Sequence, residues 1–160
     1  GGPVFDPLAL RAVSIIELGP IDQVSFAVED VAAALPAYSA LFGEFTVRTV
    51  AFSPEHVVYQ GRPATATLDL AFGRSGDLEI ELVAVVEGDG PARDHIRRHG
   101  PGLHHVRFPV EDLRTTRDAM EAAGFTVVLD GVTARGSLFA YLGAPATFGH
   151  TQFELIQHQT

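Results

Sequence analysis

Four side chains at matching positions of two similar half-chains have the chemistry to bind one metal ion together. Gln23 and His105 each precede a stretch of the pattern V-x-F-x-V-E-D, and Glu81 and Glu154 lie in two later stretches, "EIELV" and "QFELI". One imidazole, two carboxylates and one amide oxygen suit a divalent ion such as Co²⁺, Mn²⁺, Ni²⁺, Zn²⁺ or Fe²⁺. Such a ligand set would leave coordination positions open for water or a substrate.

The matching positions belong to an internal repeat. The stretch "DQVSFAVEDVAAALPAYSALFGEFTV" from Asp22 aligns with "HHVRFPVEDLRTTRDAMEAAGFTV" from His104, and each copy is followed by its own E-L stretch. A repeat of this kind indicates that one structural unit occurs twice. We therefore expect an N-terminal tail at 1–18, a first module at 19–86, a linker at 87–100 and a second module at 101–160, in one compact domain.

Each module is expected to form a strand, a helix and then three strands. Apolar residues alternate with period two in the first stretch and then follow a helical pattern. Asp30 and Asp112 are suited to cap the N-termini of the two helices, and Gly43 and Gly124 to end them. Pro36 lies inside the first helix and should kink it. The pattern predicts an α+β fold of tandem βαβββ modules, with curled mixed sheets around a cleft and helices on the outside.

Alternation along the strands places the four candidate ligands on one face. Val24, Phe26 and Val28 should face the helix, so that Gln23 lies on the opposite face. The same pattern places His105, Glu81 and Glu154 on the face away from the helices and turns His104 the other way, as a structural residue. If the sheets curl, the four side chains converge. The alternative is a polar outer face on two half-exposed sheets.

Composition excludes several other classes of function. The net charge of −9 would repel a nucleic acid backbone, and the absence of cysteine excludes a thiolate nucleophile or a disulfide framework. No stretch approaches the roughly 20 apolar residues that span a bilayer. We expect a cytoplasmic protein that acts on a small molecule, without nucleic acid or membrane partners. His95 and His99, beside three arginines in "ARDHIRRHG", are expected on a solvated basic face.

The motifs resemble those of the vicinal oxygen chelate superfamily, which includes glyoxalase I, methylmalonyl-CoA epimerase, extradiol dioxygenases and bleomycin-resistance proteins. The resemblance is carried by "DQVSFAVEDVAAAL", "EIELV", "GPGLHHVRFPVEDL" and "FELIQ", and is strongest to the epimerase and glyoxalase branch. It implies a homodimer and a metal held by Gln23, Glu81, His105 and Glu154. The family usually has histidine where this chain has Gln23, and a neutral amide binds cations more weakly.

The resemblance also implies a lyase or isomerase/epimerase in which the metal stabilises an enolate-like oxyanion and Glu154 or Glu81 transfers a proton. Tyr59 lies ahead of Gln60 and Gly61, where the epimerases carry a glutamate. With a pKa of about 10, Tyr59 would be a poor base, and it could instead form a hydrogen bond or pack in a strand. Arg107, Tyr141 and Phe139 are candidates for substrate binding. Arg107 could instead form a cross-strand ion pair with one of the glutamates, and the two aromatic residues could belong to the core.

Two other functions remain open on the same fold. One is a metal-free small-molecule binding or resistance protein, which the neutral amide of Gln23 favours. The other is an extradiol-type dioxygenase, which ranks third because its Fe²⁺ needs two histidines and one carboxylate, whereas His105 is the only histidine at a ligand position.

Overall fold

Ten strands and three helices follow one another along residues 15–160, the part of the chain that this computed structural model describes. The first half contains β1 (Gln23–Ala27), α1 (Val31–Phe42), β2 (Thr46–Phe52), β3 (Val57–Tyr59), β4 (Arg62–Pro63), β5 (Ala66–Ser75) and β6 (Leu78–Gly88). The second contains α2 (Pro91–His99), β7 (Gly102–Pro109), α3 (Leu113–Ala122), β8 (Thr126–Val132), β9 (Leu138–Gly143), a short 3₁₀ helix (Ala146–Phe148) and β10 (Gln152–Gln157).

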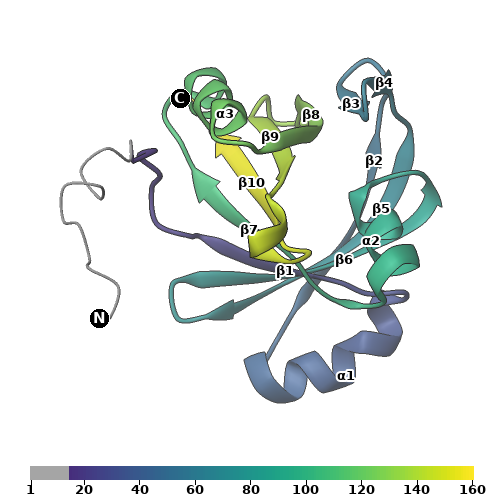
Figure 1. Ribbon diagram of the computed structural model, residues 1–160. Coiled ribbons are helices and arrows are strands. Elements are labelled where there is room, and N and C mark those ends of the chain that lie inside the picture. Colours follow the sequence, from purple (N-terminus) through teal and green to yellow (C-terminus); the bar gives the residue numbers. More distant parts are fainter. Residues whose placement is uncertain (1–14) are drawn as a thin grey trace, which may run out of the picture.

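All ten strands belong to one mixed sheet with the order β2-β5-β6-β1-β7-β10-β9-β8-β3-β4. The sheet is curled into a half-barrel, with the two half-sheets standing opposite each other (Figure 1). β1 and β7 meet in an antiparallel pair at the centre, and each is flanked by a parallel strand, β6 or β10. The first strands of the two modules therefore join the halves of the sheet.

The predicted repeat and the α+β class are confirmed. β1, α1, β2, β5 and β6 have the same order and pairing as β7, α3, β8, β9 and β10, so that the two half-sheets are alike. Two pieces lie outside this repeat. The hairpin of β3 and β4 belongs to the first module in sequence but pairs with β8 of the second, and α2 forms from the segment that we expected to be a linker.

Both predicted N-caps and the predicted end of α1 at Gly43 are found, whereas the cap at the C-terminus of α3 is Ala123, one residue before the predicted Gly124. Asp30 and Asp112 accept hydrogen bonds from the backbone amides of Ala33 at 2.9 Å and Thr115 at 3.2 Å, respectively. Gly43 ends α1 with a φ of 81°, a conformation that glycine adopts without strain. α1 continues through Pro36, and its Val31, Ala34 and Leu35 pack against the sheet.

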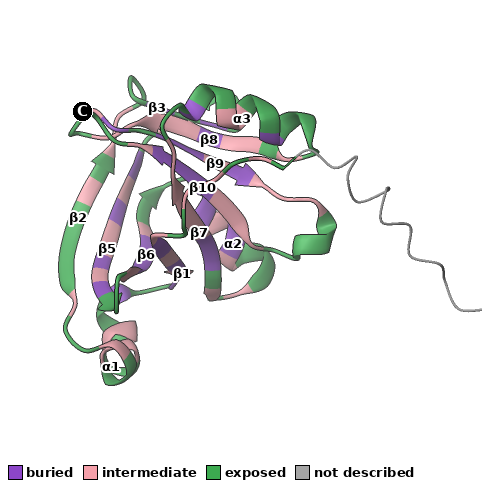
Figure 2. Ribbon diagram, turned by 90° about the vertical axis from the view of Figure 1, so that its left-hand side faces the viewer, coloured by how far each residue is buried: buried purple, intermediate pink, exposed green. Residues whose placement is uncertain are grey.

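The three helices divide between the two faces of the sheet. α1 packs through Val31 on Leu82 and Ala71, and α3 packs through Leu113 and Met120 on Leu155, all on the convex face. α2 packs on the opposite, concave face, where Ala92 contacts a cluster with Ala27, Leu68 and Val83. The central strands β1 and β7 consist mainly of buried and partly buried residues, whereas β2 is mostly exposed (Figure 2). The concave face thus carries an apolar core of its own around the polar positions of β1 and β7.

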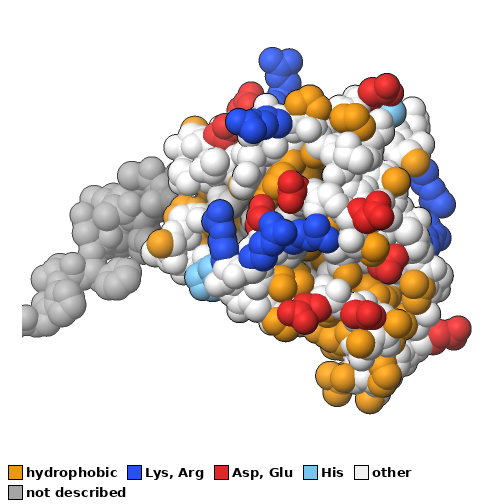
Figure 3. Space-filling model, turned by 90° about the vertical axis from the view of Figure 1, so that its right-hand side faces the viewer, with side chains coloured by type: hydrophobic (Ala, Val, Ile, Leu, Met, Phe, Trp, Pro, Cys, Tyr) orange, Lys and Arg blue, Asp and Glu red, His pale blue; other side chains and the backbone are white. Residues whose placement is uncertain are grey.

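The ends of the predicted segments differ in detail from the structure. Residues 1–14 of the expected tail lie outside the described residues, while Ile16 and Leu18 pack against the α3 cluster. β6 extends to Gly88, two residues beyond the predicted end of the first module. No helix within residues 15–160 has the length and apolar character to cross a bilayer. Acidic and basic side chains are interspersed on the face shown in Figure 3.

Candidate functional site

The four predicted ligands come together at the centre of the concave face. They lie on β1, β6, β7 and β10, which are neighbours in the sheet, one ligand on each strand. Pairing aligns Ser25 with both Glu81 and His105, and Gln152 with His105. Gln23 and His105 are each 1% exposed, and Glu81 and Glu154 are 8% and 6% exposed. The alternative of a polar outer face is therefore wrong for these four residues.

Nε2 of His105 is the point on which the other three side chains converge. It lies 3.0 Å from Oε1 of Gln23, 3.0 Å from Oε2 of Glu154 and 3.7 Å from Oε1 of Glu81. The side-chain amide of Gln23 is held in one orientation, because its Nε2 donates to Oε1 of Glu79 at 2.7 Å. The oxygen of Gln23 therefore faces the imidazole.

Ser25 is a member of this cluster that the sequence interpretation passed over. It is fully buried, and its hydroxyl donates to Oε1 of Glu81 at 2.7 Å. Its position two residues after Gln23 on the same strand was the signal that could have revealed it. Ser25 holds the carboxylate of Glu81 in place.

The donor atoms fit a divalent ion in type, and those of Gln23 and Glu154 also fit it in their distance from His105. Two donors that each lie about 2.1 Å from one ion, at roughly right angles, are about 3 Å apart, as are the donors of Gln23 and Glu154 from that of His105. However, no group of three or more His, Cys, Asp or Glu side chains within residues 15–160 is already arranged to hold a metal. The imidazole instead contacts its neighbours directly.

Burial makes negative charge costly at this place. It raises the pKa of the Glu81 carboxyl, and nearby Glu154 raises it further, against the opposing influence of His105. The pKa of Tyr141, beside the same carboxylates, is also raised, first by burial and then by the charges of Glu154 and Glu81. A proton or a metal cation at the cluster would relieve this accumulation of charge.

His104 belongs to the site, contrary to the prediction that it faces the other way. The pairing of β1 with β7 shifts between Ser25 and Phe26, so that Ser25 opposes His105 and Phe26 opposes Leu103. His104 is the extra residue of this bulge, and a bulge redirects side chains that strict alternation would separate. Nδ1 of His104 lies 2.8 Å from Nδ1 of His105.

His95 is also buried, so the predicted solvated basic face is wrong for this residue. It is 8% exposed and its ring lies edge-on to that of His104, with centroids 5.1 Å apart. The reason is that α2 packs on the concave face, which turns one side of the helix inward. His99 is exposed as expected, and its ring stacks on that of His150.

A narrow hollow adjoins the cluster under α2. Its volume is about 300 Å³ including the part open to solvent, and the centre of a water molecule can reach about 20 Å³ of it. It is lined chiefly by Phe52, Leu68, Val83, Ala92, His104 and Tyr141. The accessible part has room for about one water molecule, so a larger ligand could enter only if the walls of the hollow moved apart.

The three aromatic candidates lie together at the second half-sheet. Tyr59 and Phe139 are buried in one cluster, and Tyr141 packs against it and over His105, with ring centroids 4.8 Å apart. The hydroxyl of Tyr59 donates to Asp94 of α2. Burial and this hydrogen bond raise the pKa of Tyr59 above its ordinary value of 10.0, which makes it unsuited to act as a base.

Arg107 is held by acidic side chains. Its Nε and Nη2 donate to the two carboxylate oxygens of Asp22 at 2.9 and 3.1 Å, and Nη2 lies 3.8 Å from Oε1 of Glu79. Arg107 therefore forms an ion pair, but its main partner is Asp22, and the predicted glutamate partner is present only as the longer contact with Glu79. The role of Arg107 in substrate binding stays a prediction.

Comparison with known proteins gives the family. The profile of the Glyoxalase/Bleomycin resistance protein/Dioxygenase superfamily matches residues 22–141, most of the chain. The chain belongs to this superfamily. A search of curated proteins finds no match.

Solved structures with a similar fold include several of methylmalonyl-CoA epimerases. A variant of the Streptomyces coelicolor epimerase is 22% identical, with a TM-score of 0.62 over 90% of this chain and 97% of that one. The Mycobacterium tuberculosis epimerase is 20% identical, with a TM-score of 0.60 over 94% and 96%. A variant 4-hydroxymandelate synthase from S. coelicolor is 18% identical, with a TM-score of 0.60 over 89% of this chain and 49% of the synthase. At such identities the likeness shows a shared fold.

Proposed function

We propose that this protein is a metal-dependent lyase or isomerase/epimerase of the superfamily, in which Gln23, Glu81, His105 and Glu154 hold one divalent ion. The observation that carries the proposal is the convergence of Gln23, Glu154 and Glu81 on Nε2 of His105. The fold shared with methylmalonyl-CoA epimerases supports the class of reaction.

The charges of the cluster favour a cation. Two carboxylates lie almost completely buried beside a single imidazole, and buried charges are costly unless they are compensated. Arg107 is already held by Asp22, so its charge is shared with another acid. When bound, a divalent ion would supply a Lewis acid that stabilises negative charge on a substrate oxygen.

The residues of the chain would then position and move a proton. We assign the proton transfer to Glu81 or Glu154, because both carboxylates lie close to Nε2 of His105, whose ring contacts the hollow-lining side chains of His104 and Tyr141. Burial raises the pKa of the Glu81 carboxyl in the metal-free protein, and a bound cation would lower it again, which would keep the carboxylate able to accept a proton. Ser25 would orient this carboxylate through its hydrogen bond, and the aromatic rings over His105 would exclude water.

A metal-free binding protein is the second candidate. It is favoured by the neutral amide of Gln23 and by the direct contacts of His105 with Gln23 and Glu154, which satisfy the imidazole without an ion. An extradiol-type dioxygenase ranks below both, because one imidazole stands where such iron sites use two.

Elemental analysis of the purified protein tests the proposal. We expect about one divalent ion per chain in the wild type after incubation with Co²⁺ or Zn²⁺, and a loss of most of it in His105→Ala. The exposed His56 offers a matched control, since His56→Ala should retain the ion. Absence of metal from the reconstituted wild type would overturn the proposal and favour the binding protein.

A further inference from the structure

His104 is a buried histidine of which only one ring nitrogen has a partner. It is 2% exposed, and its Nδ1 lies 2.8 Å from Nδ1 of His105. Its Nε2 is buried and forms no hydrogen bond of ordinary geometry, although the backbone of Pro91 lies close enough to the ring to favour its protonated form, and His104 is one of the residues that line the apolar hollow under α2. Buried polar atoms are rarely left without a partner, so this nitrogen indicates a place where a ligand atom binds.

The contact between the two Nδ1 atoms determines where each ring carries its hydrogen. A neutral imidazole has one N–H, and one of two facing nitrogens must donate while the other accepts. If Nε2 of His105 is a metal ligand, it carries no hydrogen, and the hydrogen of His105 lies on Nδ1. That Nδ1 then donates to Nδ1 of His104, so His104 must carry its own hydrogen on Nε2.

We propose that His104 is a positioning residue that fixes the tautomer of His105, and that its own Nε2–H is a hydrogen-bond donor to substrate within the apolar hollow. This rests on the proposed function, because it requires His105 to bind the metal. The ligand group that fits is an acceptor oxygen, such as a carbonyl or ether oxygen, on an otherwise apolar part of the substrate. The apolar side chains of the walls, such as Leu68 and Val83, would not compensate the negative charge of a carboxylate in the hollow.

Nitrogen-15 NMR of the histidine side chains in the Zn²⁺-loaded wild type tests the tautomers directly. We expect His104 to carry hydrogen on Nε2 only, and His105 on Nδ1 only. Zn²⁺ bound at His105 together with hydrogen on Nδ1 of His104 would overturn the inference and leave the proposed function standing. No binding of Zn²⁺ at His105 would overturn both.

Two variants test the positioning role. His104→Phe retains the ring shape but removes the acceptor, and we expect about 10- to 100-fold weaker Zn²⁺ binding by calorimetric titration. His104→Asn should recover much of this loss, because Oδ1 of asparagine can accept from His105. His56→Phe is the control and should bind Zn²⁺ like the wild type. Wild-type affinity in His104→Phe would refute the role.

A pair of small probes tests the hollow in the Zn²⁺-loaded protein. The ketone 2-butanone has a carbonyl oxygen where the similarly shaped 2-methyl-1-butene has a methylene group. We expect the ketone, and not the alkene, to shift the Nε2 and Nε2–H resonances of His104, and this difference to disappear in His104→Phe. No response to the ketone, or an equal response to both probes, would contradict the inference.

Discussion

Replacing Glu81 by glutamine should have opposite effects on the metal-free and metal-loaded protein. Glu81 is buried beside Glu154, and burial followed by this second carboxylate raises its pKa. Glutamine retains nearly the same shape, and its Oε1 can still accept the hydrogen bond of Ser25. The substitution therefore removes an unfavourable charge but also removes a charged metal ligand.

The size of each effect follows from the surroundings of Glu81. A partly compensated buried charge costs on the order of 1 to 2 kcal/mol, so Glu81→Gln should raise the melting temperature of the metal-free protein by roughly 2 to 8 °C at neutral pH. Metal affinity should fall on the order of 100-fold, or about 2.7 kcal/mol.

The pH dependence has a definite sign. The folded-state pKa lies above the ordinary value of 4.5, so the stability that protonated Glu81 contributes is present below pH 4.5 and is lost as the pH rises through the raised value. The advantage of Glu81→Gln over the wild type should therefore be present at neutral pH and disappear as the pH falls toward 4.5.

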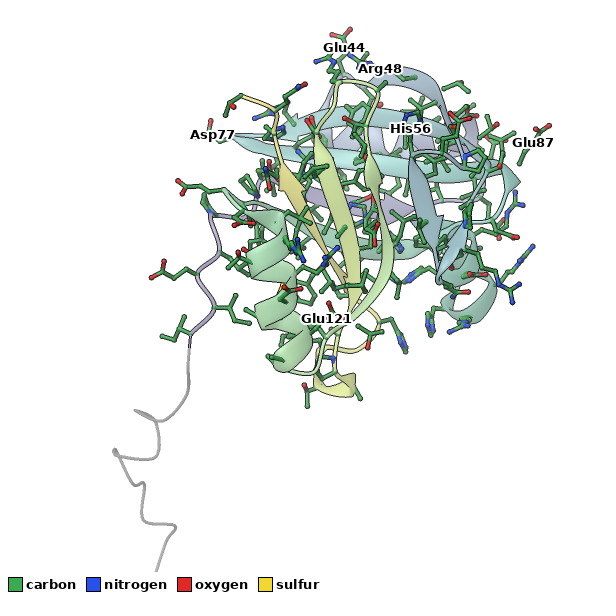
Figure 4. All side chains as sticks on the ribbon, turned by 90° about the horizontal axis from the view of Figure 1, so that it is seen from above. Glu44, Arg48, His56, Asp77, Glu87 and Glu121 are labelled. Carbon is green, nitrogen blue, oxygen red and sulfur yellow. The ribbon has the colours of Figure 1, made fainter. Side chains whose placement is uncertain are left out.

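Thermal unfolding monitored by circular dichroism, in chelator and then with Co²⁺, measures both effects. Glu87→Gln is the matched control, since Glu87 lies on the same strand but is exposed and points outward at the edge of the molecule (Figure 4). A metal-free Glu81→Gln protein that melts below the wild type would refute the reasoning, because it would mean that the charge of Glu81 stabilises the fold.

Three further substitutions test how the hollow and the helices are held. Tyr59→Phe removes the hydrogen bond to Asp94 and should lower the free energy of unfolding by about 1 kcal/mol in urea titrations; no change would mean that this bond does not hold α2. Gly131→Ala would place a Cβ 2.7 Å from the carbonyl oxygen of His56. It should lower the free energy of unfolding by about 1 to 3 kcal/mol and speed hydrogen exchange of the β3 amides, and an unchanged exchange rate would contradict this. Pro36→Ala restores an amide donor inside α1 and should raise the free energy of unfolding by about 1 kcal/mol or more, whereas a lower melting temperature would show that Pro36 fits the helix without strain.

The repeat and the alternation of apolar residues were enough to predict the fold class and the convergence of the four candidate ligands. Both signals can be read directly from the sequence. A period of two decides which face of a strand is buried, and equivalent positions of the two modules occupy equivalent places in the sheet. Capping by Asp30 and Asp112 was predictable for the same reason, because each cap lies three residues from the amide that it satisfies.

Other features depend on contacts between segments far apart in the sequence. The bulge that turns His104 into the site exists only where β7 pairs with β1, and no pattern within β7 reveals it. α2 buries His95 because the curled sheet offers an apolar concave face for Ala92 and Ile96. The β3 hairpin leaves its own module to pair with β8. The sequence by itself thus determined the repeated module and the chemistry of its four polar positions. The tertiary structure alone decided what surrounds them, because register shifts and the packing of a helix on a distant strand are properties of the assembled sheet.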